Sequence, residues 1–148
     1  MATLYNKILI SASPEEIWNV LADPARLDQY DPVTKKSELI SKIANGLGAE
    51  RKCETATGWF KDKITEFQPY DRLTFTLTGC NQPMKSLLHS YTLKKVGNQT
   101  EVSQVMKYTM KFGLIGKLMD VLIGKRESDK QIKLFFTGLK GYVEKNKN

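Results

Sequence analysis

The middle of the chain alternates between apolar and polar residues with a period of two, from Val33 to Phe112. That period is typical of strands with one buried face, because successive side chains of a strand point to opposite sides. Turn-forming residues such as Asn45-Gly46 and Gly97-Asn98 divide the region into short segments. Short connections between consecutive strands predict an antiparallel sheet. We expect its strands at Val33–Ile43, Ala49–Thr55, Gly58–Phe67, Leu73–Thr78, Lys85–Lys95 and Thr100–Phe112.

The residues before this alternating region predict one more strand and two short helices. The strand is expected at Leu4–Ile10. Ser13-Pro14-Glu15-Glu16 has the form of a capping box, with proline at the first helical position, and it predicts an amphipathic helix. Asp23-Pro24 repeats the signal and predicts a second helical turn that ends at Leu27.

The last part of the chain has apolar residues at helical spacing. One stripe contains Leu118 and Leu122, and a second contains Phe135 and Leu139. The residues that follow Gly124, from Lys125 to Gln131, are polar, so either one long helix bends near Gly124 or two helices meet there. A twisted sheet needs a cover on its apolar face, and this is the longest element available. We therefore expect an α+β fold, in which a curled antiparallel sheet of six or seven strands wraps around a long C-terminal helix.

Length and composition agree with one soluble domain over residues 1–148. The chain is 41% hydrophobic and 26% charged, close to the average for globular proteins. It has no apolar run near the ~18 residues that cross a bilayer, and its first residues lack the pattern of a secretory signal. Two cysteines are too few for a disulfide framework. We expect a cytoplasmic protein without stable membrane insertion, either a monomer or a dimer.

Short motifs follow one another along the whole chain. They are Ile10–Trp18, Leu21-Ala22-Asp23-Pro24, Gly46-Leu47-Gly48-Ala49, Ile64-Thr65-Glu66-Phe67, Asp71-Arg72-Leu73 and Leu139-Lys140-Gly141-Tyr142-Val143. Their order resembles the START-related helix-grip superfamily (SRPBCC), which includes polyketide cyclases/dehydrases and lipid transport proteins. The resemblance implies a START-like ligand-binding domain, and Tyr30 stands where members often carry tryptophan. It does not select a function, because the superfamily includes lipid carriers, cyclases and hydrolases.

The alternation also predicts which side chains face the space between sheet and helix. These are mostly apolar with a few polar groups, which is typical of a small-molecule site. A buried Asp62 is costly unless paired, and Arg51 on the neighbouring strand is its expected partner. Two alternatives remain: the pair only fills a structural gap, or a bulge turns one residue outward. The expected ligand-binding residues are Tyr30, Arg51, Cys53, Phe60, Asp62, Phe75, His89, Tyr91, Gln104, Met106, Tyr108, Leu118 and Leu122.

Few residues offer catalytic or metal chemistry. His89 is the only histidine and therefore the natural acid or base near neutral pH, with Asp62 as a second candidate. A structural hydrogen bond is the alternative role for His89. Cys53, Cys80 and His89 lack the close spacing of metal ligands, and the spacing implies no orienting residue for a Cys–His nucleophile. We expect neither a metal nor a cofactor.

These patterns predict a protein that binds a hydrophobic or amphipathic small molecule, such as a lipid, a polyketide or an aromatic metabolite, in an internal cavity. A cyclase, dehydratase or hydrolase acting in that cavity is one alternative. Another is an interaction protein that uses a basic helix face, because residues 111–148 carry +5 of the net charge of +7. No motif predicts a nucleic-acid partner. Adaptable methionines such as Met106 and Met110 leave open that side chains fill the cavity.

Overall fold

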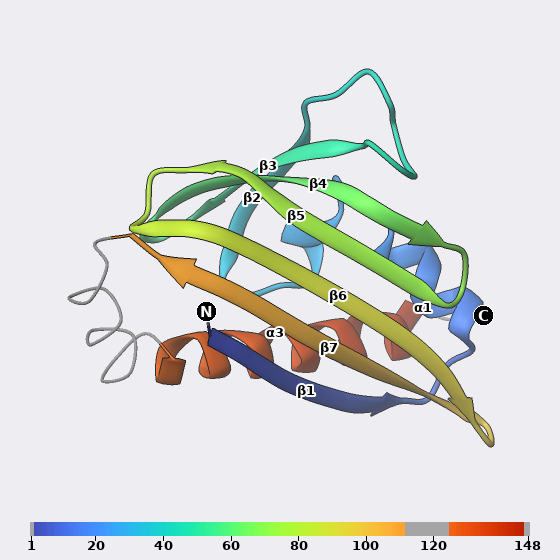
Figure 1. Cartoon of the computed structure of the whole chain (residues 1–148). Coiled ribbons are helices and arrows are strands. Elements are labelled where there is room, and N and C mark those ends of the chain that lie inside the picture. Colours follow the sequence, from blue (N-terminus) through green and yellow to red (C-terminus); the bar gives the residue numbers. More distant parts are fainter. Residues whose placement is uncertain (1, 112–124, 147–148) are drawn as a thin grey trace.

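An antiparallel sheet curls over one long helix in the computed structural model, which describes residues 2–111 and 125–146 (Figure 1). The sheet has seven strands in the order β1-β7-β6-β5-β4-β3-β2. Neighbouring strands are antiparallel throughout, as the short connections predict. The strands are β1 (Ala2–Ile10), β2 (Thr34–Leu39), β3 (Glu50–Thr55), β4 (Gly58–Gln68), β5 (Arg72–Cys80), β6 (Met84–Val96) and β7 (Gln99–Met110).

The strands match the predicted segments, with differences at their ends. The largest is in β2, which ends at Leu39 and not at Ile43. The residues that follow form the connection to β3, where Gly46 and Gly48 have φ angles of 80° and 88°. Such angles favour glycine and are incompatible with a regular strand, so the alternating pattern continues beyond the point where the backbone leaves the sheet.

The capping box is confirmed at helix α1 (Pro14–Leu21). The Glu16 amide donates to Ser13 Oγ, and the Ser13 amide donates to Glu16 Oε1, each at 3.1 Å. The prediction for the next helix is wrong in position, because the short 3-10 helix η1 (Leu27–Gln29) begins at Leu27 and does not end there. The Asp23 carboxylate accepts from the Ala25 amide at 3.1 Å and thereby stabilises a turn instead of a helix.

Helix α3 (Lys125–Asn146) lies across the concave side of the sheet (Figure 1). Its second predicted apolar stripe is confirmed as the buried face. The residues of this face are Ile132, Phe135, Phe136, Leu139 and Val143. The first stripe, with Leu118 and Leu122, and the predicted bend at Gly124 lie outside the described residues.

Three contacts fix the position of α3 over the sheet. Gly138 packs on the segment after η1, and a Cβ atom there would collide with the carbonyl oxygen of Tyr30. Near the end of the helix, Glu144 Oε2 accepts from the Ser11 amide at 2.7 Å and from Lys140 Nζ at 2.8 Å. Lys140 also donates to the Leu9 carbonyl oxygen. The helix is therefore held at both edges of the concave face.

Candidate functional site

The concave face of the sheet, under α3, gathers most of the residues predicted to line a ligand site. Phe60 and His89 are half-buried there, and Leu118 and Leu122 lie outside the described residues. The role of all these residues in ligand binding stays a prediction. The buried ones are Tyr30, Arg51, Cys53, Asp62, Phe75, Tyr91, Gln104, Met106 and Tyr108.

The predicted pair of Arg51 and Asp62 forms in the interior. The two residues lie directly opposite each other on β3 and β4, and they are 5% and 3% exposed. Arg51 Nε donates to Asp62 Oδ1 at 2.7 Å, and Nη2 donates to Oδ2 at 3.2 Å. The guanidinium also lies 4.0 Å from the centre of the Phe75 ring, a favourable cation–π contact. The alternative in which a bulge turns one partner outward is thus excluded.

A second polar group lies on β6 and β7. Gln104 Nε2 donates to the Tyr91 hydroxyl at 3.0 Å, and the two residues are paired across the strands. The Tyr91 ring faces Phe135 of α3, with ring centres 5.7 Å apart. Tyr30 approaches the same Phe135 ring at 5.7 Å. Phe135 therefore joins the sheet and the segment after η1 in one aromatic cluster.

His89 lies next to this cluster, with its ring 6.5 Å from that of Tyr91. Burial lowers the pKa of His89 to about 4, while Asp62 acts to raise it and Arg51 to lower it further. The imidazole is consequently neutral at pH 7. Among the described residues its Nε2 atom is buried without a hydrogen-bond partner. A neutral imidazole accepts a hydrogen bond at one ring nitrogen and donates one at the other, so His89 can act as a binding group. A pKa of about 4 makes it a weak base at pH 7.

Burial suppresses the ionisation of the other polar side chains. It raises the pKa of the Cys53 thiol to about 12, which removes the reactive thiolate at neutral pH. Burial likewise raises the pKa of the Tyr30 and Tyr91 hydroxyls above their ordinary value. These groups can form hydrogen bonds, and they do not act as anions or nucleophiles. Within the described part of the chain, no three metal-ligating side chains come together.

Asn6 on β1 belongs to the same face, although it is not among the residues expected to bind a ligand. It pairs with Gln104 in the sheet register, and its Nδ2 atom is buried without a partner among the described residues. The sequence does contain evidence for this position: Asn6 alternates with Leu4, Ile8 and Ile10 along the strand, and alternate side chains share one face. It is the polar member of an otherwise apolar series.

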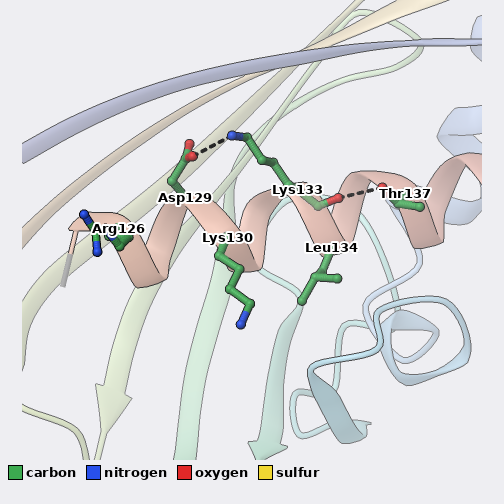
Figure 2. Close-up of a pocket in the computed structure, with 6 residues that line it drawn as sticks. All are labelled: Arg126, Asp129, Lys130, Lys133, Leu134 and Thr137. Carbon is green, nitrogen blue, oxygen red and sulfur yellow. Dashed lines mark hydrogen bonds and ion pairs between the residues drawn. The ribbon is translucent and has the colours of Figure 1, made fainter. Parts of the chain in front are cut away.

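The hollows on the described part of the chain include two that lie away from this face. One, of about 370 Å³, is on α3 and is lined by Arg126, Asp129, Lys130, Lys133, Leu134 and Thr137 (Figure 2). Lys133 pairs with Asp129 at 2.9 Å, so Arg126 and Lys130 leave the hollow positively charged. The other, of about 410 Å³, is lined by Trp18, Asn19, Ala22, Asp23, Ala44, Asn45 and Phe67. Neither includes a residue of the predicted ligand site.

Comparison with known proteins gives a family and a fold. A family model described as "Polyketide cyclase / dehydrase and lipid transport" matches residues 1–144. No curated protein matches the chain. None of the helices in the described part of the chain is long and apolar enough to cross a membrane.

Several solved structures share the whole architecture at low sequence identity. The protein TTHA0849 from Thermus thermophilus is 14% identical, with a TM-score of 0.84, over 99% of this chain and 100% of its own. A START superfamily protein from Mycobacterium smegmatis is 14% identical, with a TM-score of 0.79, over 98% and 99%. The Zhui aromatase/cyclase from a Streptomyces species is 12% identical, with a TM-score of 0.80, over 97% and 93%. These likenesses establish the helix-grip fold.

Proposed function

Because the chain belongs to the polyketide cyclase/dehydrase and lipid transport family, we propose that it binds a hydrophobic or amphipathic small molecule between the concave face of its sheet and α3. One observation carries the proposal: the buried polar side chains of Arg51, Asp62 and Gln104 lie on a face whose other buried residues are mainly apolar. Apolar walls with a few orienting polar groups are the usual make-up of a ligand site.

The apolar part of the site supplies the driving force. Phe75, Met106 and Phe135 present aromatic and thioether surfaces to the interior. Removing apolar ligand surface from water contributes roughly 25 cal/mol for each Å². Methionine adapts to the shape of its neighbours, so the interior can adjust to a guest. A ligand of the lipid, polyketide or aromatic type fits this lining.

Native mass spectrometry of the purified protein and a thermal-shift screen against such molecules test the proposal. We expect a co-purifying mass or a rise in Tm, because a ligand that binds only the folded state stabilises it. Absence of both would contradict the proposal.

A matched pair of variants locates the binding. Met106→Phe adds bulk on the inner face of β7, and Lys107→Phe adds it one residue later on the exposed outer face. We expect Met106→Phe to weaken ligand binding and Lys107→Phe to leave it unchanged. Circular dichroism checks that both variants are folded, since overpacking costs about 1–3 kcal/mol. Equal effects of the two variants would place the ligand elsewhere.

Catalysis in the same site is the second candidate, and the observation that favours it is the buried His89 Nε2 atom, which has no hydrogen-bond partner among the described residues. A cyclase or dehydratase needs a group that takes up and returns a proton. The Zhui aromatase/cyclase shares the fold, although 12% identity carries no activity over. His89→Ala should abolish turnover of a cyclisable substrate and leave the fold intact. Unchanged turnover would remove His89 from the reaction.

The third candidate is an interaction protein. Its acidic partner would bind at the basic hollow on α3 (Figure 2). Binding of an acidic partner to Arg126 and Lys130 would weaken steeply as salt rises, since exposed charges are screened over about 10 Å at 0.1 M. Affinity that does not change between low and high salt would contradict this alternative.

A further inference from the structure

Three polar atoms on the concave face are buried and have no hydrogen-bond partner among the described residues. They are Asn6 Nδ2 on β1, Gln104 Oε1 on β7 and His89 Nε2 on β6. The three strands are direct neighbours in the sheet. The unsatisfied atoms therefore occur together in one region of one face.

The sheet register places the three side chains on the same face, in two adjoining rows of residues. Asn6 pairs with Gln104, and Gln104 pairs with Tyr91, so these residues form one row across β1, β7 and β6. His89 lies two residues before Tyr91 and therefore on the same face, in the adjoining row opposite Met106. The buried residues around them include Tyr91 and Phe135, whose rings are in contact.

Leaving such atoms unpaired is costly. A buried donor or acceptor without a partner loses the hydrogen bonds that water would give it, and native proteins pair the great majority of these atoms. Exchanging the positions of the Gln104 amide oxygen and nitrogen does not remove the cost. In either orientation the Tyr91 hydroxyl pairs with one of these two atoms and leaves the other without a partner. Three unpaired atoms in one region indicate a place that a polar ligand atom completes.

The charges nearby define what kind of ligand fits. Asp31, Arg51 and Asp62 are the buried charged residues in the part of the chain that the structure describes. Arg51 and Asp62 neutralise each other, and Asp31 accepts from the Thr34 hydroxyl at 2.8 Å and the Val33 amide at 3.2 Å. A charged ligand would enter a buried site without a free counter-charge, which is strongly unfavourable.

We propose that Asn6, His89 and Gln104 form the polar recognition site for an uncharged ligand that carries a hydroxyl group on an apolar frame. A hydroxyl both donates and accepts hydrogen bonds. It can therefore pair with the Asn6 amide nitrogen, with the Gln104 amide oxygen, or with His89 Nε2 whether or not that nitrogen carries the ring proton. This inference rests on the ligand-binding function proposed above and adds the chemical class of the ligand.

Four probes with the same naphthalene ring system distinguish an uncharged hydroxyl, no polar group, a negative charge and a positive charge: 2-naphthol, naphthalene, 2-naphthoate and 2-naphthylmethylammonium. Isothermal titration calorimetry at pH 7 measures their affinities for the intact protein. We expect 2-naphthol to bind about tenfold more tightly than naphthalene, as one added hydrogen bond predicts. Both charged probes should bind more weakly than naphthalene.

Two substitutions test the residues. Asn6→Leu and His89→Phe should each reduce the preference for 2-naphthol over naphthalene to about twofold or less, with little change for naphthalene. Asn6→Leu should also raise the Tm of the ligand-free protein by about 2–4 °C, because it removes an unpaired donor. Asn19→Leu, the same change on the exposed surface of α1, is the control and should leave the preference intact.

Each outcome decides between the two proposals. Equal binding of 2-naphthol and naphthalene, tighter binding of a charged probe, or an unchanged preference in both variants would overturn the recognition site and leave ligand binding standing. Failure of all four probes to bind would contradict both. If one of the two variants does not fold, the other gives the same measurement.

Discussion

The two ends of the concave face treat buried polar groups differently. On β3 and β4, Arg51 and Asp62 satisfy each other through two hydrogen bonds and neutralise their charges. On β1, β7 and β6, Asn6, His89 and Gln104 keep atoms without partners among the described residues. Polar groups that need nothing further support the fold, whereas unpaired ones are available to a ligand. We call the part with the paired groups the structural end, and the part with the unpaired atoms, where we propose that a ligand binds, the binding end.

The strongest test of the structural end is Asp62→Ala. It leaves the Arg51 guanidinium buried without its counter-charge, and breaking such a pair destabilises proteins by about 3–5 kcal/mol. Urea unfolding followed by circular dichroism measures the loss. The double variant Arg51→Met/Asp62→Leu is the control and should recover most of it, because apolar residues of similar volume replace a buried pair at little cost. A loss below about 1 kcal/mol in the single variant would show that solvent reaches the pair.

At the binding end, the pH dependence of stability provides the next largest effect. Burial lowers the pKa of His89 to about 4, and the ordinary value in an unfolded chain is about 6.5. Between these two pH values the unfolded state therefore binds more protons than the folded state. The contribution of His89 to the free energy of unfolding is fully present above about pH 6.5 and is lost as the pH falls to about 4. The loss amounts to about 3 kcal/mol. The difference in unfolding free energy between the native sequence and His89→Phe isolates it from other groups.

Because His89 is the only histidine, proton NMR can also follow its titration directly. We expect a midpoint near pH 4 in the folded protein. A midpoint near 6.5 would mean that the imidazole is solvated, and it would place the binding end of the face closer to water than the structural end.

The sequence predicts the architecture because two local signals agree. Period-two alternation marks the strands, and turn residues such as Gly97-Asn98 mark where they end. The same alternation places Arg51 and Asp62 on one face, so their pairing follows once β3 and β4 are neighbours. The end of β2 at Leu39 is not predictable in this way. The backbone angles of the glycines after the strand decide where it ends, and the apolar pattern contains no information about those angles.

The binding end is harder to predict, because the satisfaction of a hydrogen bond depends on register. Parity alone places Gln104 and Tyr91 on the inner face, yet only the pairing of β6 with β7 sets them opposite each other. Asn6 becomes part of the row because β1 pairs with β7, which joins residues about a hundred positions apart. Sequence patterns identify faces, and the fold decides which polar atoms on a face meet.

The smallest expected effect concerns the one hydrogen bond that the binding end does contain. Tyr91→Phe removes the hydroxyl that accepts from Gln104 Nε2 and leaves both amide atoms of Gln104 unpaired. A loss of about 1–2 kcal/mol in unfolding free energy is expected, since a buried donor left alone loses its solvation. In a Gln104→Met background the same substitution should cost less, because no donor remains to be left unpaired. Equal costs in the two backgrounds would show that this bond contributes nothing, and the binding end would then differ from the structural end even more than the geometry indicates.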